Sequence, residues 1–246
     1  MDREFWNVWK HYIKKLSTIN TRHIVYKNVV VNKPWGYEYL CYQNEVLAIW
    51  LLYIEKNHKT SLHCHPNKHT GLVVLDGTAE VSFLRGSSLM TGLEKIHIFK
   101  SRFHSTKAIS DNGIFLLEVE TPEDKHDLLR LDDSYGRKDM SYEGVEYESP
   151  KDDSCIWINE PGSDALNYKN CQIEHIETQH KRDLFGYSED DFFIISRGGI
   201  WAEDKDSQIL RPSDVIDGIS LERLLNEFKL IPNSTFIHIK KGVIND

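Results

Sequence analysis

Short runs of β-branched, aromatic and aliphatic residues, separated by Gly, Asn, Asp and Lys, fill residues 24–119 of the chain. Leu47 to Ile54 and Gly71 to Leu75 are two of these runs. Because no helical period lies between them, the pattern predicts many short antiparallel strands in a sandwich or barrel. Asp76-Gly77 between two apolar runs predicts a tight hairpin turn, since both central residues of such a turn need a positive φ.

The regions on either side of these runs follow other patterns. In residues 1–23, apolar residues recur at helical spacing, which predicts an amphipathic helix; they are Phe5, Trp9, Tyr12, Ile13 and Leu16. Residues 150–246 again contain strand-like runs, with one short helix expected from Ser220 to Phe228 and Ser220 as its N-cap. We therefore expect an N-terminal helix (1–23), a β-barrel (24–140) and a second β domain (150–246).

The charge balance limits the partners that we expect. The formal net charge is −8 with His neutral, and no strong cluster of Lys and Arg interrupts it, so we expect no nucleic-acid partner. No long uncharged apolar run occurs, and the first residues contain charges and tryptophans, so we expect no membrane segment, no secretory signal and a cytoplasmic location. A few local cations suffice to bind one small anion, so the expected partner is a small molecule.

The candidate metal ligands are histidines rather than cysteines. The Cys residues are scattered with no close CxxC pair, so neither a thiolate zinc site nor a disulfide framework is predicted. In Ser61-Leu62-His63-Cys64-His65, alternation along a strand places His63 and His65 on one face. His104, which precedes another predicted strand, is the natural third ligand. On these residues alone, a metal site and a wet sheet face lined by histidines fit equally well.

Several motifs accompany the histidine pair in a fixed order. They are Lys33-Pro34-Trp35-Gly36-Tyr37-Glu38, then His63-Cys64-His65, Val73 to Val81, Phe103-His104, Leu117 to Glu120, and Asp127 to Arg137, which ends in Tyr-Gly-Arg. Together they resemble the cupin family and, within it, the mannose-6-phosphate isomerase type found fused to mannose-1-phosphate guanylyltransferases. The resemblance covers roughly three-fifths of the chain, and several ordered motifs are a stronger signal than any single one.

The resemblance implies a mainly β chain built around a cupin jelly-roll barrel. It also implies a divalent metal ion (Zn, Mn, Fe or Ni) inside the mouth of the barrel, held by His63, His65 and His104. Where the family has a glutamate, this chain has Thr70, and the adjacent His69 is a candidate to replace that ligand. The alternative is a three-histidine site with open positions for water and substrate.

The resemblance further implies interconversion of an aldose phosphate and a ketose phosphate. Such a reaction moves a proton between C1 and C2 through an enediol, so it needs a base and an electrophile near the sugar carbonyl. Glu118 and Glu120 are the candidate bases, and they share a face because they are two apart on a predicted strand. Arg137 and Lys33 are candidates to hold the phosphate or to charge the pocket. Trp35 is a candidate to stack on the sugar ring or to form the barrel wall.

The second β domain resembles a degenerate cupin repeat in Ile194 to Gly199 and Leu210 to Ile216. It lacks an HxH pair, so we expect no second metal there, and its expected role is structural, to close the pocket or to build a homodimer. We interpret the chain as a metal-dependent cupin enzyme of carbohydrate metabolism or polysaccharide biosynthesis, an isomerase or epimerase acting on a sugar phosphate or nucleotide sugar. The alternatives are a three-histidine Fe(II) dioxygenase and a non-catalytic carbohydrate-binding cupin.

Overall fold

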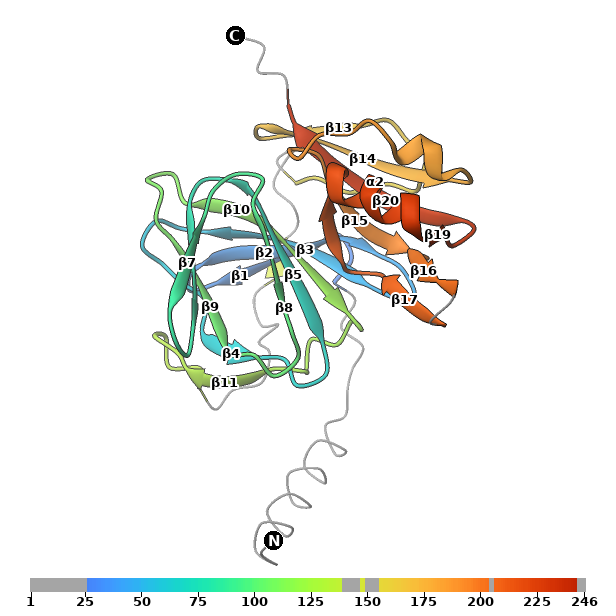
Figure 1. Cartoon of the computed structure of the whole chain (residues 1–246). Helices are drawn as coiled ribbons and strands as arrows, with labels where there is room; N and C mark the ends of the chain where they lie inside the picture. Colours follow the sequence, from blue (N-terminus) through green and yellow to red (C-terminus); the bar gives the residue numbers. More distant parts are fainter. Residues whose placement is uncertain (1–25, 139–146, 149–154, 204–205, 243–246) are drawn as a thin grey trace, which may run out of the picture.

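Two facing antiparallel sheets form the first half of the computed structural model, which describes residues 26–138, 147–148, 155–203 and 206–242. The predicted N-terminal helix lies outside the described residues. The larger sheet has seven strands, in the spatial order β12 (Tyr147–Glu148), β1 (Val30–Lys33), β2 (Gly36–Gln43), β3 (Ala48–Ile54), β10 (Ile114–Thr121), β5 (His69–Asp76) and β8 (Lys95–Ile98). The smaller sheet has five, in the order β11 (Leu129–Asp132), β4 (Leu62–Cys64), β9 (His104–Ala108), β6 (Ala79–Phe83) and β7 (Ser87–Met90) (Figure 1).

The chain passes back and forth between these sheets, which is the winding of a jelly roll. Along the sequence, β3 is followed by β4 in the other sheet, β4 by β5, β5 by β6, β8 by β9, and β9 by β10. At each of these steps the next strand lies in the opposite wall, and the two walls enclose a barrel. The expectation of a mainly β chain with a jelly-roll barrel is confirmed.

The central strands of the seven-stranded sheet are apolar on both faces. In β3, Trp50 and Leu52 belong to the core inside the barrel, whereas Ile49 and Leu51 belong to a second core on the outer face. The sequence of this strand, Ala-Ile-Trp-Leu-Leu-Tyr-Ile, is accordingly a continuous apolar run rather than an alternating one. Such a strand needs a cover on each face.

The second half of the chain covers the outer face. Its five-stranded sheet has the order β13 (Leu166–Tyr168), β14 (Cys171–Thr178), β20 (Ser234–Lys241), β15 (Phe192–Arg197) and β18 (Val215–Asp217), and a three-stranded sheet has the order β17 (Ser207–Leu210), β16 (Ile200–Ala202) and β19 (Lys229–Leu230) (Figure 1). Ile194 and Ile237 of the larger of these sheets share a core with Leu51 and Val73 of the barrel. Full burial of each such side chain contributes about 1.5–3 kcal/mol, so this core holds the two halves together.

Two helices pack on this second half, the 3-10 helix η2 (Lys181–Leu184) and the α-helix α2 (Gly218–Glu227). Leu221 and Leu225 of α2 share a core with Phe193 of β15. The predicted helix is confirmed, but its N-cap is Asp217, whose side chain accepts a hydrogen bond from the backbone N–H of Ser220 at 2.8 Å. Among the described residues, no helix is both long enough and apolar enough to cross a membrane.

The turn at Asp76-Gly77 differs from its prediction. Gly77 has the positive φ that a tight turn requires, +89°. The strands on its two sides, β5 and β6, nevertheless belong to different sheets, so the predicted hairpin is wrong. The local motif specifies the turn, whereas the pairing partner of each strand depends on the packing of the whole barrel.

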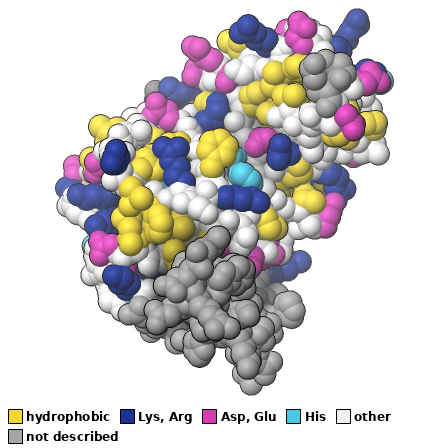
Figure 2. All heavy atoms as spheres, turned by 60° about the horizontal axis from the view of Figure 1, so that its bottom comes forward, with side chains coloured by type: hydrophobic (Ala, Val, Ile, Leu, Met, Phe, Trp, Pro, Cys, Tyr) yellow, Lys and Arg dark blue, Asp and Glu magenta, His cyan; other side chains and the backbone are white. Residues whose placement is uncertain are grey.

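Some large apolar side chains stay exposed on the barrel surface. Leu129 and Leu131 lie on β11, and Leu89 lies on β7, with exposed fractions from 40% to 68%. These strands are the two edges of the five-stranded sheet. Figure 2 shows hydrophobic side chains gathered among Lys and Arg on part of the described surface. Edges of this kind are open to pairing with another chain, and the homodimer stays a prediction.

Gly36 is a point where the backbone itself restricts the sequence. It follows Trp35 at the start of β2 with a φ of +141°, and a Cβ there would lie 2.1 Å from the carbonyl oxygen of Tyr53. We expect Gly36→Ala to lower the free energy of unfolding by about 2–4 kcal/mol, because backbone strain and the close contact both oppose the methyl group. At Gly86, with a φ of +81°, nothing lies within 4 Å of an added Cβ, so Gly86→Ala should cost about 1 kcal/mol. Urea unfolding compares the variants, and equal losses would contradict the prediction.

Candidate metal centre

Three histidines from two neighbouring strands meet inside the barrel. His63 lies within β4 and His65 follows this strand directly, while His104 begins β9 in register with His63. Alternate side chains of an extended chain point the same way, so His63 and His65 share the inner face. The ring centroids of His63 and His104 are 4.5 Å apart, and that of His65 is 5.0 Å from His63 and 5.5 Å from His104. The structure therefore brings the three predicted ligands together.

The same nitrogen of each ring faces a backbone carbonyl. The distances from Nδ1 to the carbonyl oxygen are 2.8 Å from His63 to Ser61, 2.7 Å from His65 to Asp127 and 3.0 Å from His104 to Arg102. Because a carbonyl only accepts, we assign the proton to Nδ1, which leaves a lone pair on Nε2. The Nε2 atoms of His65 and His104 are buried and have no hydrogen-bond partner among the described residues. These rings are thus set to bind a cation.

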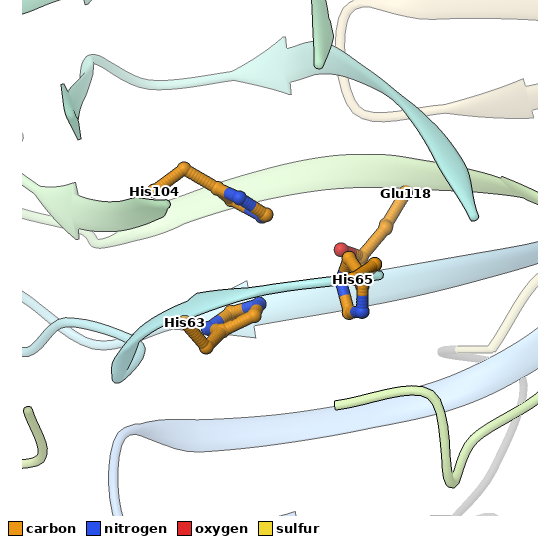
Figure 3. A group of neighbouring side chains, drawn as sticks. All are labelled: His63, His65, His104 and Glu118. Carbon is orange, nitrogen blue, oxygen red and sulfur yellow. The ribbon is translucent and has the colours of Figure 1, made fainter. Parts of the chain in front are cut away.

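A carboxylate from the opposite wall completes the group. Glu118 lies on β10, and one ligand atom from each of His63, His65, His104 and Glu118 lies within 4.8 Å of the others. Figure 3 shows the four side chains directed into the same space. Three imidazole nitrogens and one carboxylate oxygen form a donor set that suits a divalent transition metal. The buried, unpartnered nitrogens and this donor set fit the metal that the sequence predicts.

Burial controls the protonation of the group. It lowers the pKa values of His63 and His65 well below the ordinary value, and that of His104 to about 4. The rings are therefore neutral at pH 7, which is the form that binds a metal. Burial raises the pKa of Glu118 to about 7, and the nearby charge of Glu120 adds to the shift. A cation between these side chains would favour the charged carboxylate.

His63, His65, His104 and Glu118, which we call the metal group, line a cavity of about 60 Å³. This cavity has room for an ion and a few waters. Charged side chains from both walls line the same cavity; they are Lys33, Glu38, Lys68, Glu120, Lys125, Arg130 and Arg137. Lys68 Nζ lies 2.8 Å from Glu120 Oε1. Lys125 Nζ lies 3.5 Å from Glu38 and 3.8 Å from Glu120. Opposite charges thus face one another, which offsets the cost of removing them from water.

Lys125 is another buried cation of this wall. Burial acts to lower its pKa, but the carboxylates of Glu120 and Glu38 outweigh burial and raise the pKa. Its Nζ also lies 3.6 Å from the centre of the Trp50 ring, a cation–π contact that further favours the charged form. The cavity therefore holds a fixed positive charge beside its carboxylates.

His69 lies outside the metal group, so the structure does not bring it to the place of the family glutamate. On β5, Gly71 is in register with His97 of β8, which puts His69 on the same face as His97. The two rings stack with centroids 5.7 Å apart. The next residue, Thr70, pairs with Glu120 and has the opposite orientation. The carboxylate of the group comes from Glu118 on the neighbouring strand instead.

The other predicted site residues lie on the cavity wall. Lys33, Trp35 and Arg137 all line the cavity, as do both Glu118 and Glu120. Trp35 is only 4% exposed, so it forms part of the wall. Their roles in binding and catalysis stay predictions.

Sequence reasoning missed four further charged residues of the cavity, Glu38, Lys68, Lys125 and Arg130. Glu38 carried a usable signal, because it stands inside the otherwise apolar and aromatic strand β2. Lys68 and Lys125 lie in connecting segments beside Asn67 and Asp124, where a lysine is ordinarily solvated. No pattern in the sequence distinguishes them from surface residues.

Comparisons with known proteins give similarity to solved structures only. KdgF from Halomonas sp. matches with a TM-score of 0.37 and 13% identity over 43% of this chain and 94% of KdgF. CapF, a capsular polysaccharide assembling protein from Staphylococcus aureus, matches with a TM-score of 0.40 and 14% identity over 43% of this chain and 34% of CapF. A sugar phosphate isomerase from a cupin superfamily, from Silicibacter pomeroyi, matches with a TM-score of 0.34 and 15% identity over 35% of this chain and 59% of the isomerase. No family model and no curated protein matches the sequence.

We expect His63→Ala and His104→Ala to lose bound metal, because each removes one of the few ligands that the cavity offers. Elemental analysis after loading with Zn²⁺ gives the metal per chain. His97→Ala, which changes a histidine outside the group, is the matched control and should keep its metal. Full occupancy in both ligand variants would show that the metal does not bind here.

Glu118 and Glu120 should differ in their effect on metal binding. We expect Glu118→Gln to weaken Zn²⁺ binding about 10–100-fold, because a neutral amide replaces a charged carboxylate beside the ion. Glu120→Gln, two residues along the same strand, should change the affinity much less. Competition against a chromophoric chelator measures both, and the reverse order of effects would assign the ligand to Glu120.

Proposed function

We propose that the protein is a metal-dependent isomerase or epimerase that acts on a sugar phosphate or a nucleotide sugar. The observation that carries this proposal is the arrangement of two carboxylates on β10. Glu118 belongs to the metal group, and Glu120 lines the cavity beside it. An isomerase of this class needs an electrophile and a base close together, and these two positions supply one place for each.

A divalent metal held by His63, His65, His104 and Glu118 would supply the electrophile, by drawing electron density from the sugar carbonyl. The imidazoles are neutral, so Glu118 alone would offset part of the positive charge of such an ion. The remaining charge would interact strongly with a substrate carbonyl, because the site is buried.

Glu120 is the base in this proposal. Its Oε1 accepts a hydrogen bond from Lys68 Nζ at 2.8 Å, while its Oε2 is buried without a hydrogen-bond partner among the described residues. Lys68 thus holds the carboxylate in place and leaves one oxygen for substrate. Starting from the aldose, Oε2 takes the proton from C2, the C–H electrons form the C1–C2 double bond, and the electrons of the C1–O1 π bond pass to O1, which is protonated to give the enediol. As O2 loses its proton and the C2–O2 double bond forms, the electrons of the C1–C2 double bond take the proton from Glu120 at C1, which gives the ketose.

The cations of the cavity support an anionic substrate. Lys33, Arg130 and Arg137 line the cavity, and Arg137 Nη2 is fixed by Asp133 Oδ1 at 2.7 Å. The Asp133 carboxylate holds the guanidinium at the cavity wall, and a guanidinium is the side-chain group best suited to phosphate oxygens. We assign these three residues to recognition of the phosphate and Trp35 to the wall along which the sugar lies.

The test uses the metal-loaded chain and a panel of aldose and ketose phosphates in D₂O. We expect isomerisation with deuterium incorporated at C1 or C2, and loss of the reaction with a chelator. Glu120→Gln should keep its metal and lower the turnover about 10²–10⁴-fold, because it removes the proton acceptor. Arg85→Gln, at an exposed residue outside the cavity wall, is the control variant.

The same experiment separates two other functions. The three-histidine, one-carboxylate set also suits Fe(II) chemistry with dioxygen. Oxygen uptake by the Fe(II)-loaded chain without isomerisation would favour a dioxygenase. Thermal stabilisation by a sugar phosphate, with neither oxygen uptake nor isotope exchange, would favour a carbohydrate-binding module.

A further inference from the structure

Asp127 lies outside the metal group but contacts the segment that carries it. Its carboxylate Oδ2 accepts hydrogen bonds from the backbone N–H groups of Asn67 at 2.8 Å and Lys68 at 2.9 Å. Its Oδ1 accepts a hydrogen bond from the side-chain amide of Asn67 at 2.9 Å. Its own backbone carbonyl accepts the Nδ1–H of His65 at 2.7 Å. One residue therefore holds both the imidazole and the turn directly after it.

These contacts are tertiary rather than local. The four hydrogen bonds join positions 59 to 62 residues apart in the chain. Asp127 is only 7% exposed, so its carboxylate depends on these donors to replace water. Hydrogen bonds to a carboxylate are about twice as strong as those between neutral groups. The side chain thus fixes where its own backbone carbonyl lies.

The same segment also reaches the proposed base. The backbone N–H of Lys68 donates a hydrogen bond to Asp127, and the Nζ of the same lysine lies 2.8 Å from Glu120 Oε1. Lys125, two residues before Asp127, lies 3.8 Å from the same carboxylate. A shift of Asp127 would therefore move a contact of a metal ligand and two contacts of Glu120 together.

We infer that Asp127 is a positioning residue for the metal centre. Its carboxylate fixes the turn after β4 so that its backbone carbonyl meets Nδ1 of His65, which keeps Nε2 of that ring directed at the metal position. The inference rests on the metal site of the proposed function and not on the reaction assigned to it. By linkage, a metal bound there favours the docked position of the Asp127 segment to the same extent.

The test compares Asp127→Asn with Asp124→Asn in the full chain. Asp127→Asn keeps the size of the side chain but replaces one of the two accepting oxygens with an NH₂ group, which cannot accept a hydrogen bond, and it removes the charge that strengthens the remaining bonds. We expect Zn²⁺ to bind about 10–100-fold more weakly, as after loss of other contacts that orient a ligand. We also expect the visible spectrum of the Co²⁺-loaded chain to change. Among the described residues, Asp124 Oδ1 accepts a hydrogen bond only from the nearby His126 N–H, at 2.9 Å. Asp124→Asn should therefore match the parent chain in both Zn²⁺ affinity and Co²⁺ spectrum.

A purely structural role would give a different result. Asp127→Asn would then melt at a lower temperature while the folded protein kept its Zn²⁺ affinity and Co²⁺ spectrum, and this outcome would overturn the inference. If Asp127→Asn does not fold, Asn67→Ala removes only one donor to the carboxylate. It should weaken Zn²⁺ binding about 2–10-fold, the effect of one lost hydrogen bond, and an unchanged affinity would overturn the inference instead.

Failure of the proposed function gives a separate signature. If the Zn²⁺ affinity depends on Asp127 but the protein isomerises no sugar phosphate, the positioning role stands and only the proposed reaction is wrong. If the His63→Ala and His104→Ala variants keep full metal occupancy, both the metal site and the positioning role are wrong.

Discussion

Three backbone carbonyls determine what the histidines of this barrel can do. Each accepts the Nδ1–H of a different ring; they belong to Ser61, Arg102 and Asp127. The bonds fix both the rotation and the tautomer of the rings, so every Nε2 keeps its lone pair for the interior. Without them, the same side chains would fit a wet wall as well as a ligand set, which is the ambiguity that the sequence leaves open. The metal centre depends on main-chain geometry as much as on the identity of its ligands.

The second constraint is the burial of charge around those ligands. Lys68 and Lys125 compensate Glu120 and Glu38 at short range, whereas Glu118 makes no salt bridge within the described ranges. Burial raises the pKa of Glu118 to about 7, so its charged form is costly until a cation approaches. Because the histidines are neutral, a divalent ion is the natural source of that missing charge. The site thus combines neutral donors with one carboxylate that lacks a close counter-charge.

Strand alternation predicted the shared face of His63 and His65, and ordered motifs pointed to His104 and to the barrel. Alternation does not tell which face of a strand points into the barrel. It predicted that Glu118 and Glu120 share a face, but only the packing of β10 between β3 and β5 shows that this face points inward. The exclusion of His69 likewise follows from the register of β5 against β8, a tertiary property. Lys68 and Lys125 of the cavity lie in connecting segments, where sequence periodicity carries no information.

The doubly apolar central sheet has a consequence for how the molecule can be divided. Its outer face shares one core with the second half of the chain, in which Leu51 and Val73 meet Ile194 and Ile237. A barrel cut free near residue 140 would present that face to water and would self-associate or lose its shape. The apolar surface that the second half presents to the barrel is therefore a constraint on its sequence. Because they share this core, we expect the two halves to unfold together rather than as independent domains.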